Sequence, residues 1–209
     1  MSKKVTIIPA RAGSKGIPNK NLTNLKGKPL VAYSIMASKK SCVDETWVSS
    51  EDDEILNISK AYGARAIKRP DALASDTASS ESVLLHFAEQ VDFDILVFLQ
   101  PTSPMTIPED INNGIKMMEQ FDSVITVSES NQFHWSNEVP SYDINNRKRR
   151  QDCEQVYIET GAMFITSRIS LLQTKNRISG KVGFLKVPRS RSFDIDTYED
   201  LELVRKLMT

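Results

Sequence analysis

The segment from Pro9 to Asn21 combines residue types that can hold phosphate groups. It reads PARAGSKGIPNKN, so two glycines lie among the cations Arg11, Lys15 and Lys20. Glycine lets backbone N–H groups approach an anion closely, and the cations add positive charge. A triphosphate would fit such a loop, although the segment matches neither the Walker A pattern nor the dinucleotide Gly-x-Gly-x-x-Gly pattern. The alternative is a basic, solvated turn, and composition alone leaves both interpretations open.

Asp194 and Asp196 form the second group with chemical potential. In an extended segment their spacing places both carboxylates on one side, while Ile195 points into the core. Mg²⁺ typically takes one or two carboxylates together with substrate phosphates and water. The pair therefore predicts a metal site. The alternative is a pair of solvated acids ahead of a helix, because Thr197 is a favourable helix N-cap.

Neutral polar side chains follow a strongly apolar run near the middle of the chain. Gln100, Thr102 and Ser103 come directly after the run at 94–99. They offer donors and acceptors that suit the hydroxyl and amide groups of a decorated sugar. A proline-bounded turn, in which Ser and Thr satisfy local backbone groups, is the competing interpretation.

The elements that must position these residues alternate along the chain. Apolar, β-branched runs predict strands, and amphipathic stretches predict helices. The predicted strands are 4–9, 47–50, 94–99, 123–127, 161–166 and 181–187, and the predicted helices are 29–41, 55–62, 79–90, 108–120 and one beginning at Thr197. Such alternation predicts an α/β fold with a doubly wound, mainly parallel sheet, whose centre is the strand at 94–99. Ligands bind beyond the carboxyl ends of strands in these sheets, where 9–21 and 100–103 fall.

The rhythm is interrupted once, between residues 129 and 156. This stretch is polar and contains the basic run 147–150. We interpret it as an excursion from a single domain that covers residues 1–209.

Charge and composition narrow the function classes. The chain has 27 Lys and Arg against 27 Asp and Glu, so no global basic field favours nucleic acid. No apolar stretch approaches the ~20 residues that span a bilayer, which predicts no membrane segment. Two cysteines and a polar N-terminal segment predict a cytoplasmic protein.

Several motifs, in order, resemble those of the acylneuraminate cytidylyltransferase family. They lie at 8–21, 48–55, 69–76, 99–104, 157–162 and 194–196, and so extend over nearly the whole chain. The resemblance implies a Rossmann-like nucleotidyltransferase fold and a CTP-dependent reaction. The anomeric hydroxyl of a nine-carbon acidic sugar would attack the α-phosphorus of CTP, and pyrophosphate would leave. It also implies Mg²⁺, with Mn²⁺ as a substitute, and a homodimer formed through the 129–156 excursion, whose basic end nears the partner's site.

The resemblance assigns roles to particular residues. The catalytic residues would be Arg11, Lys20, Asp194 and Asp196, of which the two aspartates would also bind the metal. The nucleotide would contact Arg11, Gly13, Ser14, Lys20, Asn21, Arg69, Ser79 and Ser80. The sugar would contact Gln100, Thr102, Ser103, Tyr157, Glu159 and Gly161.

Two positions depart from the family pattern and bear on the identity of the sugar. Ile158 stands where sialic acid enzymes commonly have Arg, and Thr160 where Asn usually precedes the Gly-Ala pair. Loss of a cation there favours a less polar, deoxygenated sugar of the legionaminic type. Pseudaminic acid enzymes often have Arg at the position of Gly16, and enzymes for eight-carbon sugars usually continue Gly-Ser with Thr-Arg. Both remain alternatives, as does a nucleotide-binding module that has lost catalysis.

Overall fold

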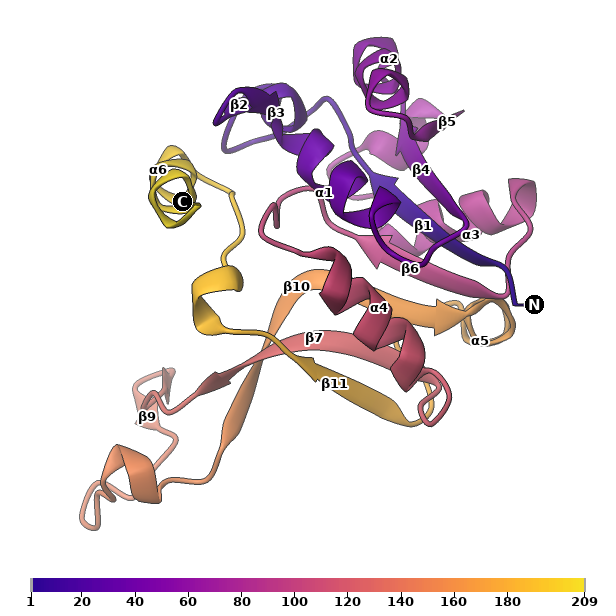
Figure 1. Ribbon diagram of the computed structural model, residues 1–209. Coiled ribbons are helices and arrows are strands. Elements are labelled where there is room, and N and C mark those ends of the chain that lie inside the picture. Colours follow the sequence, from indigo (N-terminus) through magenta and orange to yellow (C-terminus); the bar gives the residue numbers. More distant parts are fainter. Residues whose placement is uncertain (1, 209) are drawn as a thin grey trace.

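A computed structural model describes residues 2–208, without the side chain of Arg150. Its framework is a seven-stranded sheet in the order β11-β7-β10-β6-β1-β4-β5 (Figure 1). The strands are β1 (Lys4–Pro9), β4 (Glu45–Ser50), β5 (Arg65–Lys68), β6 (Ile95–Leu99), β7 (Ser123–Ser130), β10 (Val156–Ser167) and β11 (Val182–Lys186). Two short hairpins, β2 (Asn24–Leu25) with β3 (Lys28–Pro29) and β8 (Trp135–Ser136) with β9 (Val139–Pro140), lie outside this sheet.

The sheet is mainly parallel, as the sequence predicts. β1 runs parallel to both β4 and β6, β4 is parallel to β5, and β11 is parallel to β7. Only β10 among these strands runs antiparallel to its neighbours β6 and β7 in the described chain. β6 occupies the middle of the sheet, which confirms the prediction for the apolar run at 94–99.

Helices cover both faces of the sheet (Figure 1). The helices are α1 (Leu30–Lys39), α2 (Asp53–Ala61), α3 (Ser80–Gln90), α4 (Pro108–Met117), α5 (Arg168–Thr174) and α6 (Tyr198–Leu207), of which α6 stands apart from the sheet. α1 and α4 pack on one face through Ile35 and Ile111, whereas α3 and α5 pack on the other through Phe87 and Leu171. None of the helices in residues 2–208 has the length and apolar character needed to cross a membrane.

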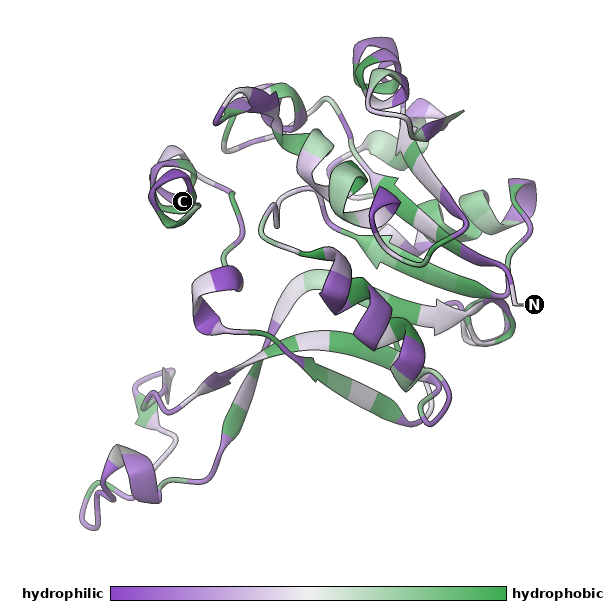
Figure 2. Ribbon diagram, in the orientation of Figure 1, coloured by the Kyte–Doolittle hydropathy of each residue, from purple (hydrophilic) through white to green (hydrophobic). Residues whose placement is uncertain are grey.

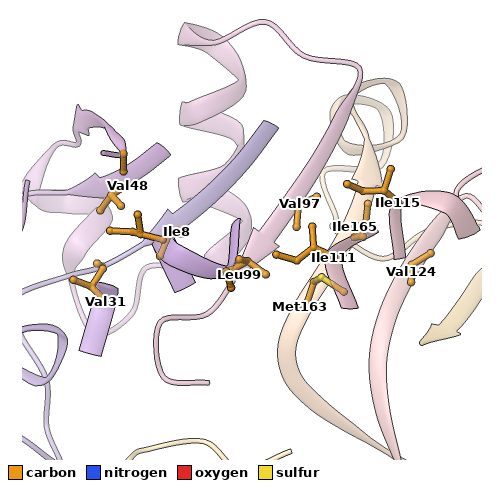
Figure 3. Close-up of a cluster of buried hydrophobic side chains, with 14 of the residues drawn as sticks. Ile8, Val31, Val48, Val97, Leu99, Ile111, Ile115, Val124, Met163 and Ile165 are labelled. Atoms are coloured by element: carbon orange, nitrogen blue, oxygen red, sulfur yellow. The ribbon is translucent and has the colours of Figure 1, made fainter. Parts of the chain in front are cut away.

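Alternating side chains of β6 explain why its sequence is apolar throughout. Val97 and Leu99 enter the core beneath α1 and α4, part of which Figure 3 shows. Leu96 and Phe98 enter the second core, beneath α3 and α5. A strand buried on both faces needs apolar residues at odd and even positions. The hydropathy colouring shows the central strands as largely hydrophobic (Figure 2).

The structure corrects several predicted boundaries. β5 and α5 had no predicted counterpart, because four residues of mixed polarity and a short helix give weak periodic signals. Pro29 caps α1 instead of beginning it. β7 and β10 are longer than predicted, and they pair with each other from Val156 opposite Ser130 onward. The predicted capping box at Thr197 and Asp200 is confirmed.

The chain leaves the sheet between β7 and β10. We call residues 131–155 the arm, which holds β8, β9 and a short 3-10 helix (Arg150–Asp152). The arm projects away from the sheet in Figure 1 and is mostly hydrophilic in Figure 2. Three large apolar side chains on it are more than half exposed, namely Trp135 at 58%, Val139 at 64% and Ile144 at 61%. A protruding segment with exposed apolar side chains is a candidate contact surface.

Candidate functional site

A cavity opens at the carboxyl edge of the sheet, where the chain after β1 and the chain after β6 diverge. β1 lies between β4 and β6, so the strand order reverses here, and such a switch point is where open α/β sheets bind ligands. The cavity has a volume of about 280 Å³. Its lining includes Pro9 from β1, Phe98 from β6 and Val83 from α3.

The structure brings together every residue that the sequence predicts to bind a nucleotide. Arg11, Gly13, Ser14, Lys20, Asn21, Arg69, Ser79 and Ser80 all line this cavity, together with Gln100 and Thr102 from the predicted sugar-binding set. Ser103, Tyr157, Glu159 and Gly161 are not among its lining residues. One site thus gathers segments that follow β1, β5 and β6 and the start of α3.

Asp76 occupies the positive side of the cavity. Its carboxylate lies 2.8 Å from Nη1 of Arg11 and 3.3 Å from Nζ of Lys15. Hydrogen bonds from these two cations hold the pKa of Asp76 below its usual value. A phosphate group that enters must compete with Asp76 for the same two side chains. Asp76 ends the motif at 69–76, from which no role is predicted for it.

Lys20 joins the N-terminal loop to the segment that precedes α6. Its Nζ lies 2.7 Å from Oδ1 of Asp196, and its side chain is only 12% exposed. Gly16 allows this approach, because a Cβ atom there would lie 2.0 Å from the backbone oxygen of Asp196. Any other residue at position 16 would push the two segments apart.

Asp194 is held in a less exposed position than Asp196. Ser103 donates a hydrogen bond to its Oδ1 atom, and the backbone N–H of Ile195 donates to the carbonyl of Thr102 at 2.9 Å. Ile195 is fully buried, as predicted. Burial raises the pKa of Asp194, and the charge of Asp196 raises it further. The Ser103 side chain therefore binds the Asp194 carboxylate, and it does not line the cavity.

The two aspartates fit a hard divalent cation. A positive ion would offset both the burial of Asp194 and its repulsion by Asp196. Within residues 2–208 no group of three His, Cys, Asp or Glu side chains could hold a metal alone. Two carboxylates completed by substrate phosphates and water are nevertheless a common arrangement for Mg²⁺.

Arg69 forms a buried wall of the cavity. Its side chain is 3% exposed, and its Nε and Nη2 atoms donate to Oε2 of Glu51 at 3.2 and 3.1 Å. Burial lowers the pKa of Arg69, and Glu51 partly restores it. Glu51 also accepts a hydrogen bond from the backbone N–H of Ala12 at 2.7 Å. Sequence reasoning missed Glu51, although its place directly after β4 at the carboxyl edge was a signal.

Asn21 lines the cavity and holds a buried acceptor. The residue is 6% exposed, and its Nδ2 donates to the carbonyl of Arg11 at 2.8 Å. Its Oδ1 atom is buried and has no protein partner among the residues described. An unsatisfied buried acceptor costs free energy.

Three of the residues predicted to contact the sugar, Tyr157, Glu159 and Gly161, lie on β10. Gly161 adopts φ = 71°, and a Cβ atom there would lie 3.5 Å from Oδ2 of Asp194 and 3.9 Å from Nε2 of Gln100. Gly161 therefore adjoins the cavity. Tyr157 lies farther along β10, where its ring packs on Phe184 with centroids 5.6 Å apart.

The two positions that depart from the family pattern have different environments. Thr160 is 7% exposed, and its Oγ1 atom lies 2.7 Å from Oγ1 of Thr126. Its hydroxyl thus joins β10 to β7 inside the core and is unavailable to a sugar. Ile158 is 41% exposed, so of these two side chains only that of Ile158 is open to solvent, although it is not among the residues that line the cavity.

The fold and the cavity define a nucleotidyltransferase-type protein, and the comparisons agree. The family model described as Cytidylyltransferase matches residues 5–208, so the chain belongs to this family. It is 33% identical over 92% of its length to N-acylneuraminate cytidylyltransferase B of Danio rerio, but covers 48% of that protein. The chain therefore spans about half the length of such relatives.

Other relatives match from end to end. CMP-N,N'-diacetyllegionaminic acid synthase of Legionella pneumophila is 34% identical, with 98% of this chain and 95% of that protein covered. Pseudaminic acid cytidylyltransferase of Campylobacter jejuni is 30% identical, with 98% and 96% covered. Among solved structures, a CMP:2-keto-3-deoxy-manno-octonic acid synthetase complexed with CTP has a TM-score of 0.79 at 21% identity, covering 99% of this chain and 98% of that one. This likeness confirms the predicted fold.

Proposed function

We propose that the chain transfers CMP from CTP to the anomeric hydroxyl of a nine-carbon acidic sugar and releases pyrophosphate. The observation that carries the proposal is the single cavity in which all the predicted nucleotide-binding residues meet at the β1/β6 switch point. The names of the relatives support the same chemistry, because they include cytidylyltransferases for acylneuraminic, legionaminic and pseudaminic acids.

The phosphate end of the nucleotide would face the loop after β1. Arg11 and Lys20 would stabilise charge that builds on the phosphoryl oxygens and on the leaving pyrophosphate. The backbone N–H groups of Gly13 and Ser14 would add donors. Asn21 would bind a ribose hydroxyl through its side-chain amide, whose Oδ1 atom has no partner among the described residues. Arg69, Ser79 and Ser80 would then lie against the cytosine, on the other side of the cavity.

Asp194 and Asp196 would hold Mg²⁺, or Mn²⁺ in its place. Bound there, the ion would supply positive charge to the triphosphate as the α-phosphorus is attacked. Ser103 and Lys20 keep the two carboxylates in place through their hydrogen bonds.

The acidic sugar would enter beside the nucleotide, along Gln100, Thr102 and Gly161. Tyr157 and Glu159 would contact its outer substituents from β10. We further propose a sugar of the legionaminic type. Ile158 supplies no charge or hydrogen bond at an exposed position, and a legionaminic acid synthase is among the relatives matched over nearly their full length.

The arm would join two copies of the chain into a homodimer. Its exposed Trp135, Val139 and Ile144 are suited to a protein contact. Arg147 packs over Phe133 and Tyr142, with its guanidinium carbon 4.4 and 5.4 Å from the ring centroids, so it braces the arm. Of the predicted basic run, the side chain of Arg150 lies outside the described part of the structure.

A pyrophosphate-release assay tests this function. The purified chain is supplied with CTP, Mg²⁺ and a panel containing N-acetylneuraminic, legionaminic, pseudaminic and eight-carbon ulosonic acids. Release with a nine-carbon acid supports the proposal, and release only with the eight-carbon acid contradicts it. Binding of CTP without turnover on any sugar would instead indicate a non-catalytic nucleotide-binding module.

A further inference from the structure

Glu51 connects two walls of the cavity without lining it. The residue follows β4 directly, and its side chain is 15% exposed. Oε1 accepts a hydrogen bond from the backbone N–H of Ala12 at 2.7 Å. Ala12 belongs to the loop after β1, residues 10–21, which we call the phosphate loop. Oε2 accepts both Nε and Nη2 of Arg69, at 3.2 and 3.1 Å. One carboxylate thus contacts the segments that follow β1 and β5, on either side of β4.

These bonds extend the sheet by one step at its carboxyl edge. The last backbone contacts here run from Ala10 N–H to the Ser49 carbonyl at 2.9 Å and from Arg69 N–H to the Ser50 carbonyl at 3.0 Å. Beyond these bonds the segments that follow β1, β4 and β5 separate, and backbone pairing no longer fixes their spacing. The Glu51 side chain fixes the spacing instead, because it hydrogen-bonds to both the segment after β1 and the segment after β5.

The charge of Glu51 is also required by its surroundings. A guanidinium as buried as that of Arg69 needs a counter-charge to remain in place. Within the described residues, the ion pair that Arg69 makes is with Glu51. Because Nε and Nη2 are engaged, Arg69 would present Nη1 toward a ligand in the cavity. Rotation of the guanidinium away from this orientation would break two charge-assisted bonds.

We propose that Glu51 is a positioning residue that sets both the phosphate loop and Arg69 for CTP. The inference rests on the proposed function and deepens it. Glu51 touches no ligand and acts only through Ala12 and Arg69, so its loss should weaken nucleotide binding more than the chemical step. The main consequence is a rise in KM for CTP that exceeds the fall in kcat.

The experiment compares Glu51→Gln and Glu51→Asp with the wild type. Glu51→Gln keeps the size but loses the charge, and we expect CTP affinity to fall about 10- to 100-fold, as for a lost charge-assisted pair. Glu51→Asp keeps the charge on a shorter arm and should recover part of the affinity. CTP binding is measured by calorimetry without sugar, and KM and kcat by pyrophosphate release, well below the melting temperature of every variant.

Asp52→Ala, which removes a helix cap, is the matched control. Asp52 is the next residue, and its Oδ1 caps α2 by accepting from the N–H of Ile55 at 2.9 Å, with no contact to the cavity. We expect a lower melting temperature and an unchanged KM for CTP. If Glu51→Gln behaves in the same way, Glu51 is merely structural and the inference is wrong. If Glu51→Gln does not fold, the CTP affinity of Glu51→Asp decides, and a wild-type value contradicts the inference.

Failure of the proposed reaction gives a different result. A wild type that binds CTP but releases no pyrophosphate refutes the reaction, while the binding ratio between wild type and Glu51→Gln still tests Glu51. A wild type that binds no CTP refutes both.

Discussion

The Nζ atom of Lys20 lies 2.7 Å from Oδ1 of Asp196, although 176 positions separate the two residues. This ion pair joins the loop after β1 to the segment before α6. It places a cation and a carboxylate at one edge of the proposed triphosphate site. The same carboxylate is a proposed metal ligand, so Lys20 and the metal would hold it from different sides.

Replacement of Asp196 tests the metal site. We expect Asp196→Asn to lower turnover at least about 10²-fold, because charge stabilisation in the transfer step is lost. Excess chelator should abolish wild-type activity. Glu199→Gln, at an exposed position in the first turn of α6, is the control and should retain full turnover. Near wild-type activity of Asp196→Asn would show that the carboxylate is structural.

Arg11 should contribute more to the reaction than to folding. Its side chain is 34% exposed and contacts the exposed Asp76, so Arg11→Ala should change the melting temperature little. Loss of a charge-assisted donor to a phosphoryl oxygen typically costs about 10²- to 10³-fold in turnover. Steady-state kinetics and thermal melting separate the two effects. Unchanged turnover with intact CTP affinity would move the phosphate site elsewhere.

Asp76 should weaken the binding of CTP, whereas Arg11 should favour it. Its carboxylate engages Arg11 and Lys15, so a triphosphate that binds these two side chains must displace it. Asp76→Asn should therefore bind CTP a few-fold more tightly, with the gain largest at low salt because exposed ion pairs are screened. Calorimetric titration at two ionic strengths measures both. Weaker binding by Asp76→Asn would instead indicate that Asp76 contacts the nucleotide or its metal.

The exposed apolar side chains of the arm lead us to expect a homodimer. Trp135 is 58% exposed on the arm, and large aromatic side chains at the centre of interfaces often contribute at least about 2 kcal/mol to association. Trp135→Ala should then raise the dissociation constant of a homodimer by more than about tenfold. Sedimentation velocity over a dilution series measures it. A wild type that remains monomeric at high concentration contradicts the dimer.

The sequence predicts best where local chemistry is strong. The all-apolar run at 95–99 marks the central strand because a strand buried on both faces allows few alternatives. The Gly- and Lys-containing loop likewise indicates an anion site. Contacts between distant segments leave no such local trace, and neither the bond from Glu51 to Arg69 nor the pairing of Asp76 with Arg11 could be predicted.

Thr160 shows a different limit of sequence reasoning. A comparison of motifs places it beside Ile158, and both positions suggest an altered sugar pocket. The bulge between Glu159 and Phe164 and the contact with Thr126 put the Thr160 hydroxyl inside the core instead. Residue type alone cannot reveal that Ile158 is exposed whereas Thr160, two positions later, is buried.

The proposed choice of sugar therefore rests on Ile158. An exposed branched apolar side chain offers no hydrogen bond, so a more hydroxylated sugar would leave polar groups unpaired, at about 1 to 3 kcal/mol for each. We expect kcat/KM for a legionaminic-type acid to exceed that for N-acetylneuraminic acid by about tenfold or more. Competition between the two sugars in one reaction measures the ratio directly.

Ile158→Arg should then shift this ratio toward N-acetylneuraminic acid, because the guanidinium supplies the missing donors and charge. Val156→Arg adds the same charge two residues earlier on β10, at a side chain of similar exposure, 44% against 41% for Ile158. This control should leave the ratio unchanged, since Val156 lines a hollow beside the arm and lies two residues farther than Ile158 from Gly161 along β10. Equal kcat/KM for both sugars in the wild type, or the same shift from both variants, would refute a specific role for Ile158.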